Sequence, residues 1–229
     1  MHPSIFLVAA AHASGSAAAV PTAAAPPAAE AAAPAPAAPR SYTLDGSRGE
    51  LHVRVFKDPA TMAAGIAHDH AVLATGWTGR FTWDAAQPAA CQLTITVPVA
   101  SLDPDPPALR AAVGLPGALP DNQRGEIKAH LLAESQLWAA RFPSITFQAT
   151  ACRPTGSALE VTGNLTIRGQ ARKVVFTGQF SADEAGFRLK GSLPVKATDH
   201  GFQPYSALLG AVRNQDRMVL HIDLQGIPG

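Results

Sequence analysis

The feature that most constrains the fold is the stretch of residues 161–176, in which apolar and polar side chains alternate on both sides of a glycine. Gly163, Leu165 and Ile167 fall on one face, and the residues between them fall on the other. Alternation with a period of two is what a half-buried β-strand requires. Gly169 has the backbone freedom that a tight turn into the next strand needs. The stretch therefore predicts a β-hairpin.

The same alternation recurs along most of the chain after residue 40. Further strands are predicted at residues 42–44, 51–56, 70–83, 92–99, 145–150, 187–196 and 218–224. Many short strands joined by tight turns favour an antiparallel sandwich or barrel. The sequence thus predicts a mainly β domain.

Residues 121–140 break this rhythm, because Ile127, Leu131 and Trp138 follow helical spacing. Pro143 prevents the predicted helix from continuing. The preceding residues 103–107 (Asp-Pro-Asp-Pro-Pro) predict a stiff loop with solvated carboxylates. The expected order is therefore strands, loop, helix and strands.

The first forty residues have a different composition. A short apolar run at residues 5–11 is too short to span a bilayer, which needs about 20 residues, and resembles the core of a secretory signal peptide. A mis-assigned start is the alternative, because no Lys or Arg precedes the run. We predict a signal peptide at residues 1–16, a disordered Ala/Pro-rich linker at 17–40, and one folded domain at 41–228.

The charge balance bears on the partners. The formal net charge is +1, which gives no electrostatic reason to expect nucleic acid or an anionic membrane surface as a partner. No apolar run is long enough for stable membrane insertion. A homodimer stays open, because one sequence does not settle oligomeric state.

Several motifs together resemble one family. The segment Gly163–Gly169 is similar to the G-x-L-T-I-R-G signature of the YceI-like family of bacterial lipid-binding barrels. Residues 41–45, 76–81, 131–147 and 199–202 resemble, in the expected order, other conserved segments of that family. The match covers roughly residues 41–226.

This resemblance implies a fold and a function. The family fold is a lipocalin-like antiparallel β-barrel of about eight strands with an inserted α-helix, and such a barrel has room for one slender ligand. By resemblance, the chain is expected to be a periplasmic or secreted carrier. It would hold a long-chain isoprenoid or a similar amphipathic lipid in the barrel lumen.

The apolar strand positions identify candidates for the lumen wall. They are Leu93, Ile95, Val97, Phe147, Leu165, Ile167, Phe176, Phe180, Leu189, Leu193, Leu220 and Ile222. The alternative is that these side chains fill a solid core and leave no space for a ligand.

A histidine segment departs from the common family pattern. On a strand, His68 and His70 would project to one face and Asp69 to the other. Two imidazoles can share a metal or heme, but a third ligand is needed, for which His200, His130 and Asp199 are candidates. The alternative is a polar strand start held by hydrogen bonds. His52 and His221 fall on the polar faces of their strands and are expected to face solvent.

The two cysteines allow two interpretations. Cys91 precedes one predicted strand and Cys152 ends another, so antiparallel pairing of the strands would bring them together. Face parity argues against a disulfide, because Cys91 shares the face of Leu93 whereas Cys152 shares the outward face of Thr150. A β-bulge would repair the parity, so both states stay open.

The sequence contains no standard catalytic, nucleotide-binding or phosphate-binding motif. We therefore expect no enzyme activity and no cofactor. Two hypotheses stand: a lipid carrier, and a metal- or heme-binding barrel built on the two neighbouring histidines. A barrel that contacts only other proteins is the third.

Overall fold

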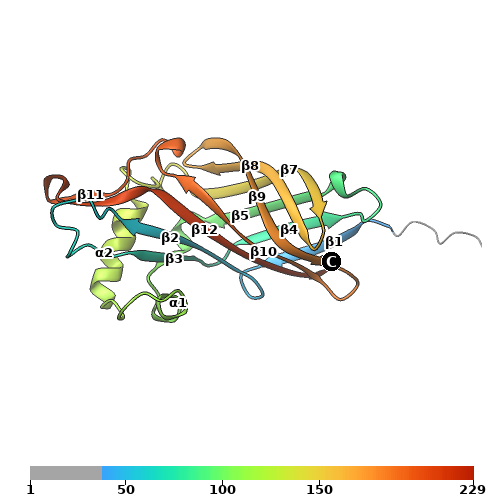
Figure 1. The fold of residues 1–229 in the computed structure, drawn as a ribbon, viewed down its shortest axis with the longest axis horizontal. Coiled ribbons are helices and arrows are strands. Elements are labelled where there is room, and N and C mark those ends of the chain that lie inside the picture. The colour runs from blue at the N-terminus through green and yellow to red at the C-terminus, as the bar shows by residue number, and fades with distance from the viewer. Residues whose placement is uncertain (1–37) are drawn as a thin grey trace, which may run out of the picture. The chain divides into compact units, whose positions relative to one another are not determined.

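The structure, a computed structural model, describes residues 38–229, and these residues form twelve β-strands and two α-helices (Figure 1). The strands are β1 (Arg40–Asp45), β2 (Glu50–Lys57), β3 (His70–Ala74), β4 (Thr78–Trp83), β5 (Gln92–Pro98), β6 (Leu102–Pro104), β7 (Ser144–Thr155), β8 (Ala158–Ile167), β9 (Gln170–Ala182), β10 (Phe187–Lys196), β11 (Ser206–Ala207) and β12 (Val212–Pro228). The helices are α1 (Pro107–Ala112) and α2 (Asp121–Leu132). The predicted signal peptide and all but the last three residues of the predicted linker lie outside the described residues.

The predicted hairpin is the β8–β9 pair. Ile167 pairs with Gln170, which leaves Arg168 and Gly169 as a two-residue loop. Both loop residues have a positive φ, 50° and 72°. Positive φ at both positions defines a type I′ turn, whose twist matches that of the flanking strands.

Eight strands close into an antiparallel barrel in the order β1, β4, β5, β7, β8, β9, β10 and β12. The ring closes where β1 pairs with the end of β12, for example Tyr42 with Pro228. Closure leaves these strands without free edges. The prediction of an antiparallel barrel of about eight strands with an inserted helix is confirmed.

The first part of β12 carries a second set of strands. β2 pairs with β12 from Asn214 to Asp223, and β3 and β6 extend the sheet from β2. In Figure 1, β2, β3, α2 and β11 lie toward one end of the barrel, and β1 and the C-terminus lie toward the other. The prediction of a loop at residues 103–107 is wrong in part, because residues 102–104 form β6. An edge strand tolerates a proline such as Pro104.

The helix α2 is shorter than predicted, ending at Leu132 instead of residue 140. The chain reverses after Leu132, where the Leu137 N–H donates to the Leu131 carbonyl at 3.1 Å and the Trp138 N–H donates to the Ala133 carbonyl at 2.9 Å. This reversal brings Leu137 into the hydrophobic core. No helix within residues 38–229 combines the length and apolar character needed to cross a membrane.

Aromatic side chains fill the end of the barrel near β1. The Phe81 and Phe187 rings lie 4.3 Å apart, and the Trp83 and Phe180 rings lie 4.8 Å apart. Tyr42 packs beside them, and its hydroxyl donates to the Asp183 carbonyl. This end is therefore packed core.

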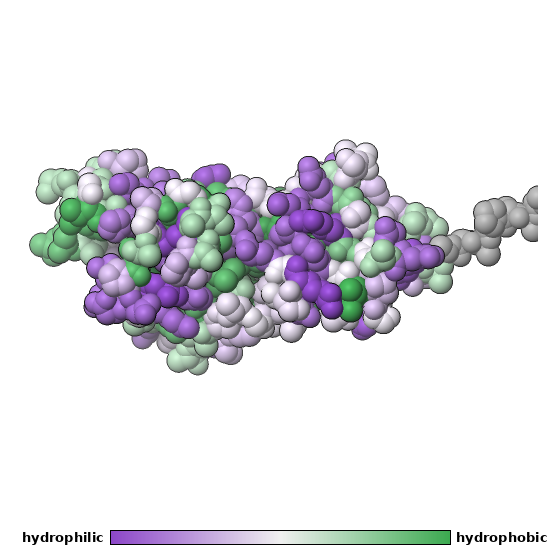
Figure 2. Space-filling view, turned by 90° about the horizontal axis from the view of Figure 1, so that it is seen from below, coloured by the Kyte–Doolittle hydropathy of each residue, from purple (hydrophilic) through white to green (hydrophobic). Residues whose placement is uncertain are grey.

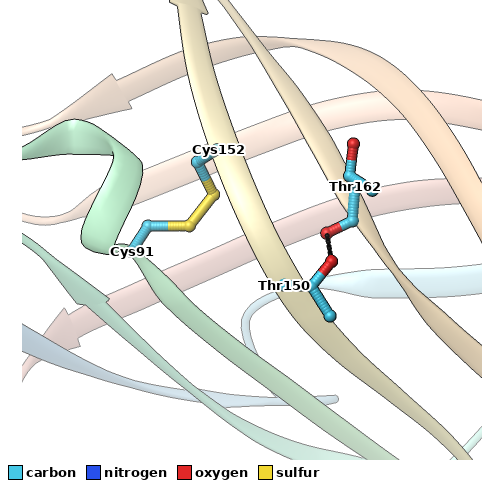
Figure 3. The surroundings of a disulfide bond; sticks show 4 residues. All are labelled: Cys91, Thr150, Cys152 and Thr162. Carbon is cyan, nitrogen blue, oxygen red and sulfur yellow. Dashed lines mark hydrogen bonds between the residues drawn. A yellow bond between two sulfur atoms is a disulfide. The ribbon is translucent and has the colours of Figure 1, made fainter.

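A disulfide joins Cys91 to Cys152, with Cα atoms 5.9 Å apart (Figure 3). The pairing of β7 with β8 shifts by one residue between Ala149 and Ala151, which makes Thr150 the extra residue of a β-bulge. The bulge turns Cys152 into the core. The expectation that Cys152 faces outward is therefore wrong, because parity counting assumes an unbroken strand.

Candidate binding cavity

A cavity of about 390 Å³ lies between the barrel strands and the added elements β2, β3, β6 and α2, and it is open to the outside on one part of its surface. This volume lies within the range of about 300–1,000 Å³ typical of small-molecule sites. Its wall takes residues from helix α2 and from strands β2, β3, β5, β6, β7, β8, β9, β10 and β12, whereas the described strands β1, β4 and β11 contribute none. The cavity therefore occupies the part of the barrel away from the aromatic cluster, and most of its wall is aliphatic or aromatic.

Most of the predicted lumen residues line this cavity. Ten of the twelve do so: Leu93, Ile95, Val97, Phe147, Leu165, Ile167, Phe176, Leu193, Leu220 and Ile222. Phe180 and Leu189 also point inward but lie in the packed part, where Phe180 contacts Trp83 and Leu189 is fully buried. Alternation predicts which face is inside, but it carries no information on height along the barrel axis.

Several polar side chains gather at one end of the cavity, and His52 and His221 line it farther along β2 and β12. His130 of α2 lies with its ring 5.2 Å from that of Tyr205, and both residues line the cavity. The Tyr205 carbonyl accepts the N–H of Asn214, a third lining residue. His70 pairs with β2 two residues from the β2 position opposite Asn214, so it lies at the same end. An apolar interior with a polar end suits an amphiphile.

His70 is held by a buried carboxylate. Its Nδ1 lies 2.6 Å from Asp105 Oδ2, and the other Asp105 oxygen accepts the Ala71 N–H at 3.0 Å and Arg110 Nη1 at 2.8 Å. Burial by itself raises the pKa of Asp105, but hydrogen bonds and charge from His70, Ala71 and Arg110 outweigh it and lower that pKa below its usual value. An ionised carboxylate only accepts hydrogen bonds, so His70 Nδ1 is the donor.

The same network anchors the α1 segment. Arg110 is 2% exposed, and its Nε and Nη2 donate to the carbonyls of Gly117 and Pro116 at 2.8 and 2.7 Å. The interpretation of Asp105 as a solvated charge is wrong, because the side chain is fully buried. Its backbone has a positive φ of 53°, and its carboxylate contacts His70 and Ala71 of β3.

The histidines predicted as metal ligands are dispersed. His68 lies in the loop before β3 and is exposed, so it does not share a strand face with His70. His200 is buried elsewhere, with Nδ1 3.0 Å from the Gln170 carbonyl, and burial lowers its pKa. Within residues 38–229, no group of three or more His, Cys, Asp or Glu side chains is arranged to hold a metal ion. The metal or heme hypothesis gains no support from this part of the chain.

His52 and His221 face each other on neighbouring strands, with stacked rings 4.5 Å apart. The His52 side chain is only 10% exposed, so the expectation that it faces solvent is wrong. Burial lowers the pKa of both imidazoles. Each ring is covered by its neighbour, which strand-by-strand reading of the sequence does not show.

Sequence reasoning missed two parts of the site. Leu51, Val53 and Val72 also line the cavity, and their alternating pattern predicted strands without showing that β2 and β3 form a cavity wall. The pairing of Asp105 with Arg110 left no periodic signal, because it depends on how a proline-rich segment turns. Nothing local to that segment identifies the burial of its carboxylate.

Comparisons with known proteins agree with this architecture. A family model described as the YceI-like domain matches residues 42–225. A UPF0312 protein of Enterobacter sp. strain 638 is 28% identical over 126 residues, covering 52% of this chain and 56% of that protein, so the chain spans little more than half of that relative. A UPF0312 protein of Pseudomonas fluorescens is 27% identical over 160 residues, covering 66% of this chain and 70% of that protein.

Solved structures show the same fold. The crystal structure of BcnA from Burkholderia cenocepacia has a TM-score of 0.56 and 19% sequence identity, covering 76% of this chain and 95% of that chain. At this level of identity the likeness concerns the barrel and not its ligand.

Proposed function

The chain belongs to the YceI-like family, and from this premise we propose that it is an extracytoplasmic carrier that holds a long-chain isoprenoid or a similar amphipathic lipid inside its barrel. The observation that carries the proposal is the apolar cavity of about 390 Å³ with polar side chains at one end. The proposed role is binding, with no catalytic step.

The chemistry of the wall supports a hydrocarbon ligand. Each buried CH₂ group contributes about 0.8 kcal/mol, so about ten of them contribute about 8 kcal/mol before the entropic cost of binding. The wall is built largely from Leu, Ile, Val and Phe side chains, which pack against hydrocarbon and carry no hydrogen-bonding groups that would need water. A polar metabolite would lose its hydration there without compensation.

The polar end supports an orientation for the ligand. The hydrocarbon chain would lie toward the aromatic cluster, and the head group would lie near His70, His130 and Tyr205. Because Asp105 holds Nδ1 of His70, the other ring nitrogen is left for a head-group hydrogen bond.

The disulfide supports an extracytoplasmic location. Stable disulfides form in oxidising compartments and are rare in reducing cytosol. The Cys91–Cys152 bond lies in the core, where it serves as a structural cross-link. The predicted signal peptide at residues 1–16 leads to the same proposal.

Native mass spectrometry of the full chain purified from its host tests the carrier proposal. We expect an adduct of several hundred daltons that is released on denaturation. Ile95→Trp and Leu165→Trp place a large ring in the cavity and should abolish the adduct. Val175→Trp is the matched control, because Val175 is 49% exposed on β9 and does not line the cavity.

The folded state of each variant is checked by its urea unfolding midpoint. Two cavity positions are used so that at least one variant keeps a midpoint close to that of the wild type. A folded cavity variant that retains the adduct at the wild-type level refutes binding in the lumen. A wild-type protein that carries no adduct and takes up no added polyisoprenoid alcohol refutes the carrier role itself.

A further inference from the structure

Large exposed hydrophobic side chains are concentrated at one tip of the barrel. Six such side chains occur in the described part of the chain, and four of them belong to two neighbouring loops: Met62, Ile66, Leu208 and Leu209. Met62 is 95% exposed and Leu209 is completely exposed. Figure 2 shows hydrophobic residues gathered at this end, the end that carries β11 in Figure 1. We call these four residues the apolar tip.

The two loops are fixed to each other. The Ala63 N–H donates to the Ala211 carbonyl at 2.9 Å, which joins the loop after β2 to the loop after β11. At their base, Arg213 forms an ion pair with Asp58 at 2.6 Å. The apolar tip is therefore one built surface and not two independent loop ends.

The backbone of the tip is in an unfavourable conformation. Leu208 and Leu209 have φ of 51° and 53°, a left-handed conformation that is costly for a bulky side chain. Here it aims two leucines into solvent, where they gain no packing energy within the barrel. Backbone strain of this kind is concentrated at functional sites.

The part of each loop that forms the tip is uncharged, and the ionised side chains Lys57, Asp58 and Arg213 lie at its base. Residues 59–67 and 204–212 contain no Asp, Glu, Lys or Arg.

Tyr205, which immediately precedes β11, lines the polar end of the cavity, and so does His70, which follows the first loop. The polar end of the cavity, which we call its mouth, therefore lies next to the apolar tip, and none of the four tip residues lines the cavity itself.

We propose that the apolar tip inserts into the surface of a lipid bilayer and holds the cavity mouth against it, so that an amphiphile passes between membrane and barrel without crossing water. This inference rests on the proposed carrier function. A ligand with a long hydrocarbon chain resides in membranes, because each exposed CH₂ group opposes its transfer into water. An uncharged tip of aliphatic side chains enters the interfacial region of a bilayer without the cost of desolvating a charged group.

A second copy of the chain fits this surface less well. A stable protein interface buries about 800 Å² and about 20–30 residues on each partner. The tip presents four large apolar side chains on two narrow loops, which is too little for such a contact. Shallow insertion into a bilayer requires no larger area.

Vesicle flotation of the full chain tests the proposal. Vesicles of pure phosphatidylcholine are used first, and vesicles with added phosphatidylglycerol second. The test variant is Leu208→Ser with Leu209→Ser, and the matched control is Val175→Ser with Ile227→Ser, the other two large exposed apolar residues. We expect wild type and control to float with both vesicle types, and the tip variant to bind about tenfold less or weaker still.

Salt and mass measurements complete the design. Raising the salt concentration should leave flotation unchanged, because residues 59–67 and 204–212 carry no charge and Asp58 and Arg213 at their base are paired with each other. The proposal is overturned if the wild type fails to float, if the tip variant floats equally well, or if salt abolishes binding. Dimerisation through the tip, seen by sedimentation without flotation, also overturns it.

Native mass spectrometry of the same samples separates the two proposals. A barrel that carries its lipid adduct but never binds vesicles refutes the membrane contact and leaves the carrier role standing. An empty barrel that takes up no added polyisoprenoid alcohol but floats in a tip-dependent way refutes the carrier role and leaves the membrane contact standing.

Discussion

Reduction of the Cys91–Cys152 bond should lower the free energy of unfolding by about 2–4 kcal/mol. The two cysteines are 61 residues apart in sequence. In the chain-entropy model, a cross-link that closes a loop of this length raises the free energy of the unfolded state by about 4 kcal/mol at 25 °C, because it removes chain entropy. This value is the upper end of the expected effect. Measured values for disulfides commonly fall below this figure.

Urea unfolding with and without reductant measures the effect. A single domain of this size has a urea m-value of about 2–3 kcal/mol per molar, so the midpoint should fall by about 1–2 M. Because both sulfurs are buried, the protein should be reduced in the unfolded state and then refolded. The variant Cys91→Ala with Cys152→Ala is the control, and reductant should not change its midpoint.

Two outcomes refute this reasoning. If thiol titration of unreduced protein, denatured without reductant, finds two free cysteines, the bond is absent from the protein. If the thiols are oxidised but the midpoints with and without reductant coincide, the cross-link does not constrain the unfolded chain. The first outcome would also remove the disulfide as support for an extracytoplasmic location.

Two further perturbations test the buried polar groups. Asp105→Asn should lower the free energy of unfolding by about 3–5 kcal/mol, because Arg110 would be left buried without its counter-charge. Urea unfolding midpoints measure this loss. The control is Glu184→Gln at an exposed ion pair, which should change the free energy of unfolding by less than about 0.5 kcal/mol. Stability should also fall as the pH drops below about 6.5, since His52 and His221 have lowered pKa values in the fold and the unfolded chain then binds more protons. Urea midpoints across pH 5–8 should vary less in the His52→Gln, His221→Gln double variant, and an unchanged pH profile would exclude these histidines as a cause.

The barrel and its inward faces follow from the sequence through local physics. Period-two alternation requires one face of each strand to be buried, and a glycine such as Gly169 permits the two-residue turn. The alternation and the turn glycine are both local features, so they can be interpreted without knowledge of the rest of the fold. For the same reason, ten of the twelve predicted lumen side chains line the cavity.

The tertiary structure alone decides where the barrel is hollow. Phe180 and Phe176 lie on the same face of β9, yet the first packs against Trp83 and the second lines the cavity. The difference arises from their height along the axis, which depends on the register between strands distant in sequence. A one-residue bulge at Thr150 likewise turns Cys152 inward, against the parity of its strand.

The polar part of the site has the same origin. Asp105 and Arg110 are buried together because the α1 segment folds back on β3. The apolar tip exists because two loops about 150 residues apart in sequence are joined by the Ala63–Ala211 hydrogen bond. Composition and spacing determine the type of element and the face that it buries. Which side chains meet in space depends on the energies of pairing between distant segments, and the sequence of one strand or loop does not specify the segment with which it pairs.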